Sequence, residues 1–448
     1  MKIFEEIESE VQSYARNFPL IFKNAKGEFL YDLDDNPYLD FLAGAGSLNY
    51  GHNNPVFKKA LLDYIDNDGV THSLDLHTIA KGEFMTTFKE KILEPRGYNY
   101  LLQFTGPTGT NAVEAAFKIA RNCTGRDSII SFTNGFHGVT LGSLAATGNS
   151  SHRKAAATGL HDVNRMPYYG YLGNDLNTTE YLDKVLSDPS SGIDIPAAVV
   201  VETVQGEGGI NACTMEWLHD LYNVCKKHDI LMIIDDIQAG CGRTGTFFSF
   251  ENAGFTPDIV TLSKSLSGYG LPFALVLLKP EYDLWKPGEH NGTFRGNNHA
   301  FITAKAAIEH YWSDDTFEKE IQEKGEYIKH RLNVIASNYG EGNFTVCGRG
   351  MFQGLNCVNG EIASNITRRA FKKGMILETS GSNDHVVKLL CPLTISWENL
   401  KKGIEIIEES VGEVCKTEKI PQESDYFDDV IISTNNNIDY DSKTVEKS

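Results

Sequence analysis

Three features are missing from this chain, and each absence excludes a class of protein or a kind of site. It has no run of about 18 or more apolar residues, the length that a membrane-spanning helix needs. Its first ten residues, MKIFEEIESE, lack the basic start and apolar core of a signal peptide. Its eight cysteines are scattered, without a Cys-x-x-Cys pair or the ligand spacing of a zinc site. We therefore expect a cytoplasmic protein with reduced thiols, no membrane span and no metal site.

Positive charge is also scarce. The chain has 41 Lys and Arg against 60 Asp and Glu, so its formal net charge is −19. Because nucleic acid and anionic membranes bind basic surfaces, neither is expected as a partner. A small anionic substrate stays compatible, since local charges in a pocket can oppose the global sign. With 448 residues, 41% apolar and 23% charged, the chain is typical of a globular protein with a large core.

Short apolar, β-branched runs alternate with helical patterns through the middle of the chain. This alternation predicts an α/β fold with a mostly parallel central sheet that is covered by helices on both faces. Strands are expected at 101–105, 128–133, 197–202, 230–235, 259–263 and 274–278. Helices are expected between them at 111–121 and 217–228.

The ends of the chain differ from this pattern. Residues 1–45 predict a helix followed by a short β meander, and we expect this segment to pack with a smaller domain. Residues 46–305 form the predicted large domain. Residues 306–425 predict a smaller α+β domain, with helices near 304–311, 317–337 and 397–414 and strands near 345–357. Residues 426–448 are acidic and Asn-rich, which is typical of a disordered tail.

Polar residues follow the predicted strands. In open parallel sheets a ligand lies beyond the carboxyl ends of the strands. Five residues fall at or just past such ends, and these are Thr105, Thr133, Glu202, Asp235 and Lys264.

The pair Lys264 and Asp235 indicates a particular chemistry. A lysine at one strand end can form a Schiff base with the aldehyde of pyridoxal phosphate, and a carboxylate at another can keep the pyridine nitrogen protonated. A lone lysine is more often a solvated surface group, so the pair gains its meaning from its neighbours. Gln238 follows Asp235 and could donate to the ring hydroxyl oxygen.

Three loops could complete such a site. The small residues of 106–114 could expose backbone amides to a phosphate, although taken alone they are better explained by an ordinary Gly/Pro loop with a Thr or Asn N-cap. Phe136 could stack on a cofactor ring, or with His137 it could simply belong to a turn that packs on the core. Glu202 and Glu207 lie in a Gly-rich turn after a buried strand, where solvated acids are the alternative.

Four segments together resemble the class III aminotransferases, which are pyridoxal phosphate enzymes of fold type I. They are 200–209 (VVETVQGEGG), 235–240 (DDIQAG), 242–245 (GRTG) and 262–264 (LSK), within a resemblance that spans residues 20–415. The resemblance implies Lys264 as the Schiff-base lysine and Asp235 as the partner of the pyridine nitrogen. It implies a homodimer or higher homo-oligomer in which Thr293 reaches the cofactor phosphate of the partner subunit. The predicted cofactor-binding set is Gly109, Thr110, Phe136, His137, Glu202, Asp235, Gln238, Lys264 and Thr293.

Further segments resemble one subgroup of this family. They are 44–55, 263–272, 287–298, 386–395 and 426–430. The subgroup moves the amino group of glutamate to aspartate 4-semialdehyde, giving 2,4-diaminobutyrate and 2-oxoglutarate at the start of ectoine biosynthesis. Other interpretations stay open at this point: an aminotransferase for 4-aminobutyrate or ornithine, a diaminobutyrate enzyme of a siderophore or polyamine pathway, or a non-catalytic binding protein.

One position departs from the wider family. Many members carry an arginine before the segment that corresponds to 392–395, where it binds the α-carboxylate of glutamate, and this chain has Lys388. A lysine offers a point charge and not a planar guanidinium, so its interaction with a carboxylate should be less directional. We expect Lys388 and Glu207 to bind substrate, with Glu207 masking the lysine when the second substrate arrives.

Overall fold

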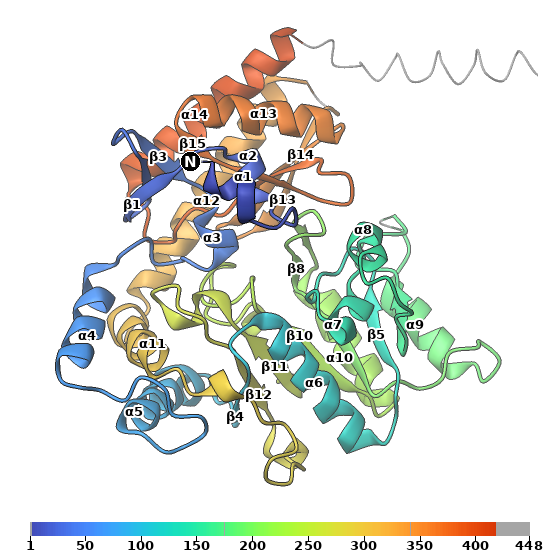
Figure 1. The fold of residues 1–448 in the computed structure, drawn as a ribbon. Coiled ribbons are helices and arrows are strands. Elements are labelled where there is room, and N and C mark those ends of the chain that lie inside the picture. The colour runs from blue at the N-terminus through green and yellow to red at the C-terminus, as the bar shows by residue number, and fades with distance from the viewer. Residues whose placement is uncertain (1, 174, 341, 418–448) are drawn as a thin grey trace, which may run out of the picture.

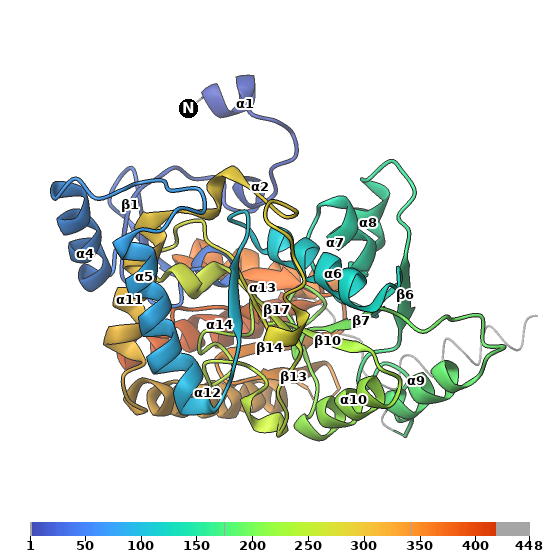
Figure 2. The ribbon, with the colours of Figure 1, turned by 90° about the horizontal axis from the view of Figure 1, so that it is seen from below.

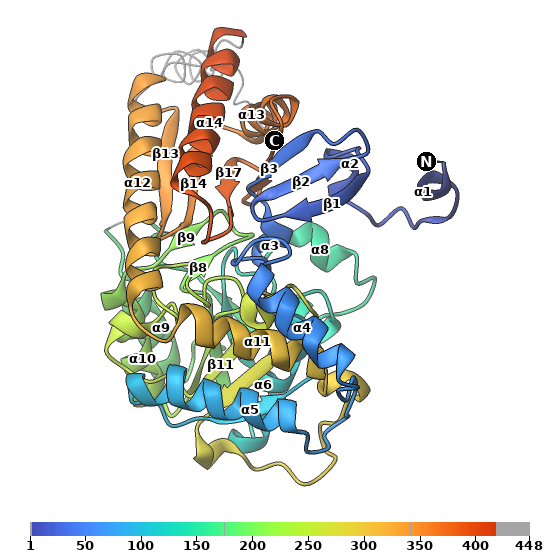
Figure 3. The ribbon, with the colours of Figure 1, turned by 90° about the vertical axis from the view of Figure 1, so that its left-hand side faces the viewer.

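The computed structural model describes residues 2–173, 175–340 and 342–417. Figure 1 shows two parts, a larger one around a seven-stranded sheet and a smaller one with two four-stranded sheets. A two-stranded ribbon, β8 (Val204–Gln205) with β9 (Asn211–Ala212), lies where the two parts meet (Figure 3). No helix of the described ranges is both long and apolar enough to cross a membrane.

The large sheet has the predicted architecture. Its order is β4-β12-β11-β10-β7-β5-β6, in which β12 runs antiparallel to β11 and β4 and the other strands are parallel. The strands are β4 (Leu101–Phe104), β5 (Ile129–Phe132), β6 (Val163–Met166), β7 (Ala198–Val201), β10 (Leu231–Asp235), β11 (Ile259–Leu262) and β12 (Leu275–Leu278). The six predicted strands are confirmed, and β6 adds an edge strand that we did not predict.

Alternate residues of the central strands enter two different cores. Val200 and Ile233 pack with helix α6 (Gly109–Thr124), whereas Val199 and Ile234 belong to the core that contains Trp217 of α10 (Met215–Lys227). Figure 2 shows the sheet running between α6 and α10. Both faces are therefore buried, which explains why these strands are apolar throughout. α9 (Thr178–Ser187) packs beside α10.

A three-helix layer covers another side of the sheet. α11 (Asn298–Tyr311) packs against α4 (Pro55–Asp66) and α5 (Ile79–Phe88), as Figure 3 shows. α4 and α5 were not predicted from the sequence, and α11 starts before the predicted residue 304. The Asn297 side chain caps α11 by accepting from the backbone amide of Ala300.

The smaller part joins the two ends of the chain. β15 (Met375–Ile376) pairs with β3 (Pro37–Asp40), so the N-terminal meander and the C-terminal segment share one sheet. The other members of the two small sheets are β1 (Phe22–Lys26), β2 (Phe29–Asp32), β13 (Phe344–Arg349), β14 (Phe352–Cys357), β16 (Glu378–Ser380) and β17 (Val386–Leu389). The helices of this part are α12 (Thr316–Asn338), α13 (Gly360–Lys372) and α14 (Trp397–Thr417).

Short helical turns complete the fold. The α-helical ones are α1 (Ile3–Ile7), α2 (Tyr14–Asn17), α3 (Ala43–Gly46), α7 (Leu141–Ala146) and α8 (Ser150–Lys154). The others are η1 (Lys89–Leu93), η2 (Glu94–Arg96), η3 (Glu251–Ala253), η4 (Lys264–Ser267), η5 (Pro280–Tyr282) and η6 (Thr293–Arg295). The domain boundaries near 45, 305 and 425 stay predictions, and the predicted tail at 426–448 lies outside the described residues.

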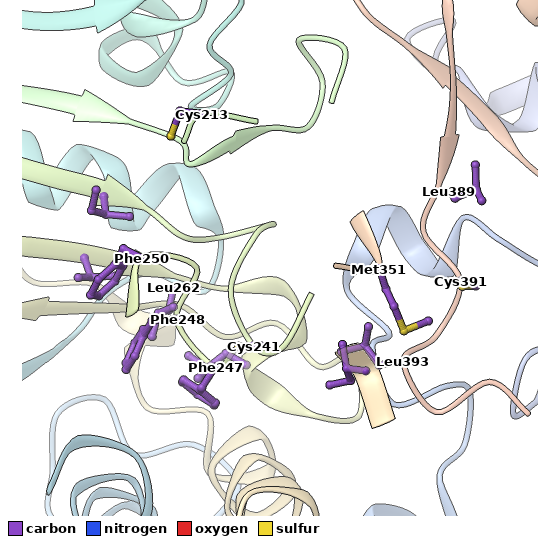
Figure 4. Close-up of a cluster of buried hydrophobic side chains, with 14 of the residues drawn as sticks. Cys213, Cys241, Phe247, Phe248, Phe250, Leu262, Met351, Leu389, Cys391 and Leu393 are labelled. Atoms are coloured by element: carbon purple, nitrogen blue, oxygen red, sulfur yellow. The ribbon is translucent and has the colours of Figure 1, made fainter. Parts of the chain in front are cut away.

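One apolar core continues from the large part into the small part. Figure 4 shows it with Cys213, Cys241, Phe247, Phe248, Phe250 and Leu262 near the large sheet and Met351, Leu389, Cys391 and Leu393 in the small part. The buried guanidinium of Arg243 crosses the same boundary. It donates to the carbonyl of Cys391 at 2.7 Å and to Oδ1 of Asn49 at 2.6 Å. These hydrogen bonds hold the segment just after β17, the strand that contains Lys388, against the large part.

Candidate active site

Asp235 and Lys264 meet at one edge of the large sheet. Asp235 ends β10, and Lys264 follows β11 after a single residue, Ser263. Since β10 and β11 are parallel neighbours, with Asp235 opposite Thr261, both side chains lie at the carboxyl ends of adjacent strands. Sequence reasoning had predicted this juxtaposition.

The Asp235 carboxylate is buried and held from two sides. Its Oδ2 lies 2.7 Å from Nδ1 of His137, and its Oδ1 accepts from the Thr261 hydroxyl at 3.2 Å. His137 is also buried. Burial alone would lower the pKa of His137, but the hydrogen bond and the charge of Asp235 outweigh it and raise that pKa. The imidazole thus fixes the orientation of the carboxylate.

The Lys264 amine lies among polar groups near the boundary with the small part. Nζ donates to the carbonyl of Ala45 at 3.0 Å. Lys264 and Ala45 both have a positive φ, +48° and +55°, which is uncommon for residues with a side chain. Burial and the nearby charge of Lys388 lower the pKa of Lys264, while the carboxylate of Glu207 opposes this shift. The amine is therefore poised closer to neutrality than a surface lysine.

Gln238 connects the lysine to the acids of the site. Its Nε2 donates to the same carbonyl of Ala45 at 2.9 Å and reaches Oε1 of Glu207 at 3.4 Å. Lys264, Ala45, Gln238 and Glu207 thus form a continuous polar chain across the site.

Glu202 is buried directly after β7. Its Oε1 accepts from the backbone amide of Phe136 at 2.8 Å, and its Oε2 accepts from that of Gly206 at 3.3 Å. Burial, together with the negative charge of Asp235, raises the pKa of Glu202 to about 7, against the opposing charge of His137. The carboxyl group of Glu202 therefore connects the backbone of the Phe136 loop to the backbone of the turn at Gly206. The Phe136 ring is half-buried and meets the ring of His152 edge-on, with centroids 5.7 Å apart.

Gly109 and Thr110 lie at the N-terminus of α6, where backbone amides point outward. A Cβ atom on Gly109 would lie 2.9 Å from Cδ1 of Ile237, so only glycine fits this approach without a shift. The Thr110 hydroxyl lies 2.6 Å from the hydroxyls of both Thr140 and Ser143. Small and hydroxyl-bearing residues therefore gather at a helix start, a setting that suits a phosphate.

Thr293 comes from a different part of the chain than the other predicted site residues. It lies in η6 and its side chain is exposed. The neighbouring Gly292 faces the backbone of Gly106, since a Cβ atom there would lie 4.0 Å from the Gly106 nitrogen. The loop that contains Thr293 therefore lies beside the loop at 106–114 of the same chain, while the side chain of Thr293 is exposed to solvent.

Lys388 has two carboxylate partners, and only one of them was predicted. Its Nζ lies 2.9 Å from Oε1 of Glu207 and 2.8 Å from Oε1 of Glu378. The lysine side chain is fully buried. Burial would lower the pKa of Lys388, but Glu207 and Glu378 raise it overall, so the amine stays charged. The same pairing keeps the pKa of Glu207 low although its side chain is partly buried.

Glu378 and Tyr14 escaped the sequence reasoning. Glu378 is a single acid in a short strand, without a motif around it, and only the strand register reveals its partner. Tyr14 comes from α2, near the N-terminus. Burial and the carboxylates of Glu378 and Glu207 raise the pKa of the Tyr14 hydroxyl, so this ring faces the same acids. Among the residues that the structure describes, no three His, Cys, Asp or Glu side chains group as metal ligands.

A family model described as aminotransferase class III matches residues 11–411. The chain belongs to this family. It is 56% identical over 420 residues to a diaminobutyrate–2-oxoglutarate transaminase of Bordetella parapertussis, covering 94% of this chain and 97% of that one. It is 57% identical over 408 residues to the protein of the same name from Vibrio cholerae, covering 91% and 99%. It is 56% identical over 412 residues to the Halomonas elongata protein of that name, covering 91% of this chain and 98% of that one.

Two solved transaminase structures have a similar fold over most of the chain. The ornithine aminotransferase of Toxoplasma gondii matches with a TM-score of 0.79 at 22% identity, covering 93% of this chain and 94% of that one. An S-selective transaminase of Arthrobacter matches with a TM-score of 0.83 at 21% identity, covering 93% and 98%. At such identities the likeness concerns the fold alone, and it agrees with fold type I.

A class III aminotransferase is a pyridoxal phosphate enzyme, and the residues present here fit that cofactor. The buried, His-supported carboxylate of Asp235 suits a pyridinium nitrogen. The buried amine of Lys264 suits an aldehyde, because its lowered pKa favours the nucleophilic neutral form. The N-terminus of α6 at Gly109 and Thr110 offers backbone amides without intrahelical partners, which suit a phosphate.

Proposed function

We propose that this chain is a diaminobutyrate–2-oxoglutarate transaminase. It transfers the amino group of L-glutamate to L-aspartate 4-semialdehyde and yields L-2,4-diaminobutyrate and 2-oxoglutarate, as the first step of ectoine biosynthesis in the cytoplasm. The substrate assignment is supported by relatives of that name, which are 55–57% identical over nearly their whole length. The observation that carries the chemistry is the ion pair between the buried Lys388 and the partly exposed Glu207, linked through Gln238 to Lys264.

We assign the cofactor contacts as follows. Pyridoxal phosphate, when bound, supplies an electron sink that makes the α-proton of an amino acid removable. Asp235 would hold its ring nitrogen, Gln238 its ring hydroxyl, and Phe136 one ring face. Gly109 and Thr110 would hold its phosphate. His137 supports this set by holding Asp235, and Glu202 by fixing the backbone of Phe136.

In this proposal Lys264 both anchors the cofactor and moves the substrate proton. An amine can act as a general base only in its neutral form, and burial shifts Lys264 toward that form. The carbonyl of Ala45, 3.0 Å from Nζ, orients the amine within the site. Positioned proton transfer of this kind contributes roughly 10² to 10⁴-fold in rate.

The two substrates place different demands on one site. Glutamate carries a carboxylate on its reacting carbon, whereas the aldehyde carbon of aspartate 4-semialdehyde carries none. Lys388 supplies a cation for the first, and Glu207, already 2.9 Å from its Nζ, covers that cation for the second. A reversible ion pair therefore lets one pocket accept both molecules.

We further propose that the working unit is a homodimer or a higher homo-oligomer. Exposed apolar side chains gather near η6, where the rings of His72 and Phe294 meet with centroids 5.3 Å apart. Leu74, Leu76, Ile79 and Phe294 expose between 45% and 82% of their surface. Such apolar exposure favours a partner surface. Thr293, exposed in the same loop, would then reach the phosphate of the partner subunit.

Steady-state assays with three aldehydes test this function. Purified enzyme is given glutamate with aspartate 4-semialdehyde, succinate semialdehyde or glutamate 5-semialdehyde, and kcat/KM is compared. The proposal requires the highest kcat/KM with aspartate 4-semialdehyde. A preference for succinate or glutamate semialdehyde would instead identify a 4-aminobutyrate or ornithine type of enzyme.

A further inference from the structure

We infer that Glu378 is a fixed counter-ion that positions the Lys388 ammonium, whereas Glu207 is the exchangeable partner whose place a substrate carboxylate takes. The inference rests on the proposed function, since it assigns different roles to two carboxylates of that site. It makes Glu378 a positioning residue for the half-reaction with glutamate.

The fixed character of Glu378 follows from the strand register. Glu378 on β16 is the direct antiparallel partner of Lys388 on β17. Residues paired in this way have side chains on the same face and close together. β17 is also bonded on its other edge to β14, where Gly354 faces Lys388, so the lysine backbone is held from both sides. The Glu378 side chain is only 7% exposed, which leaves it little freedom to move away.

Glu207 has the opposite character. It lies in the turn between β8 and β9, and its side chain is 31% exposed. Its backbone carbonyl accepts from the amide of Gly381 at 3.1 Å, so the side chain can rotate while the main chain stays anchored. Its second contact, with Gln238, is long at 3.4 Å. Glu207 can therefore leave Lys388 without disturbing the strands.

A lysine needs such a fixed partner more than an arginine does. An ammonium on a flexible four-carbon stem has no planar fork to set its direction. With Glu207 as its only partner, the ammonium could follow that carboxylate as it moved and would not meet the incoming substrate. Glu378 prevents this, because it keeps one carboxylate on the buried ammonium at every stage. Exchange is then one carboxylate for another, and the buried cation never loses all its partners.

Removing the Glu378 charge has two electrostatic effects that oppose each other. It favours any anion that approaches Lys388, but it equally strengthens the hold of Glu207, the anion that must leave. Because both anions compete for the same cation, these effects largely cancel, and the loss of orientation remains. Glu378→Gln should therefore weaken the response to glutamate, whereas Glu207→Gln removes the competitor and should not.

The test measures the two half-reactions of the holoenzyme separately. The absorbance change of the cofactor is followed in single turnover with glutamate, and then with 2,4-diaminobutyrate. Binding of glutarate, a dicarboxylate without an amino group to transfer, is measured by calorimetry. The variants are Glu378→Gln and Glu207→Gln, and Glu361→Gln on the exposed start of α13 is the matched control.

Opposite patterns are expected for the two site variants. Glu378→Gln should weaken glutarate binding and the apparent affinity for glutamate by about tenfold, with diaminobutyrate turnover within about twofold. Glu207→Gln should impair the diaminobutyrate half-reaction and leave glutarate binding unchanged or tighter. In the Glu378→Gln background, Lys388→Arg should restore glutarate binding, because its planar fork is pre-organised.

Two results would overturn the inference. One is an equal loss in both half-reactions of Glu378→Gln without rescue by Lys388→Arg, which would indicate a structural role. The other is the same pattern in both site variants, which would make the two carboxylates interchangeable. If wild-type enzyme reacts with glutamate but not with diaminobutyrate, the proposed function fails, and the glutarate and glutamate measurements still decide the role of Glu378.

Discussion

His137 and Asp235 are 98 residues apart in the sequence, yet Nδ1 of the histidine lies 2.7 Å from Oδ2 of the aspartate in the buried site. The ring comes from the loop after β5 and the carboxylate from the end of β10. This contact gives Asp235 a partner that holds the orientation of its carboxylate. We therefore regard the two residues as one unit that faces the cofactor ring.

Breaking this unit should affect the chemical step more than cofactor binding. Asp235→Asn keeps the shape but removes the charge that would hold a proton on the pyridine nitrogen. We expect the single-turnover rate of α-proton removal to fall by roughly 10²-fold or more, with a smaller change in cofactor affinity. His137→Asn should produce a weaker form of the same pattern. Proton removal at the wild-type rate in Asp235→Asn would contradict this role.

Lys264→Ala should lose turnover and keep the cofactor site. The substitution removes both the covalent anchor and the proton carrier, so kcat should fall by at least about 10³-fold. Added methylamine should restore part of the rate, because a small amine can enter the space of the missing side chain. Turnover close to wild type would disprove the assignment. A loss without any amine rescue would indicate structural damage.

Glu202 should give the protein a stability that depends on pH. Burial raises its pKa from 4.5 to about 7, so the folded chain holds an extra proton between these values. Folding stability must then fall as pH rises through this window, by up to about 3 kcal/mol above pH 7. Glu202→Gln cannot titrate, so its Tm relative to wild type should increase from pH 5 to pH 8 in cofactor-free protein. A constant difference, as expected for the exposed control Glu361→Gln, would refute the shift.

Hybrid dimers test whether Thr293 acts across the interface. Thr293→Asp should repel the phosphate, and Lys264→Ala inactivates its own site, so each parent homodimer should be nearly inactive. If Thr293 serves the partner subunit, a hybrid of the two variants contains one intact site and should show about half of wild-type activity. If Thr293 serves its own chain, beside Gly106, the hybrid gains nothing. Sedimentation of the active species checks that it is at least a dimer.

The strand ends could be predicted because they are local features. Each apolar run stops at a polar residue, and parallel strands bring their carboxyl ends to one edge, so the sequence alone was enough to pair Asp235 with Lys264. The edge strand β6 was missed because its residues, Val-Asn-Arg-Met, include only two apolar side chains. α4 and α5 were missed as well, and their burial depends on α11, far along the chain.

Contacts that depend on long-range register could not be predicted. Nothing near Glu378 indicates Lys388, since their pairing follows from how β16 aligns with β17. The same holds for His137, which sequence reasoning assigned to the cofactor and which the structure brings to Asp235. Its direct contact with the cofactor stays a prediction. The positive φ of Lys264 and Ala45 is likewise invisible in the sequence, because non-glycine residues rarely adopt it.

The most direct test of the central claim follows the nitrogen atom. The enzyme is incubated with ¹⁵N-labelled L-glutamate and unlabelled L-aspartate 4-semialdehyde, and the products are analysed by mass spectrometry and ¹⁵N NMR. The account predicts 2-oxoglutarate together with 2,4-diaminobutyrate that carries the label on C4 alone. Lys264→Ala should form neither product. Label that stays on glutamate, with no labelled 2,4-diaminobutyrate formed, would contradict the account.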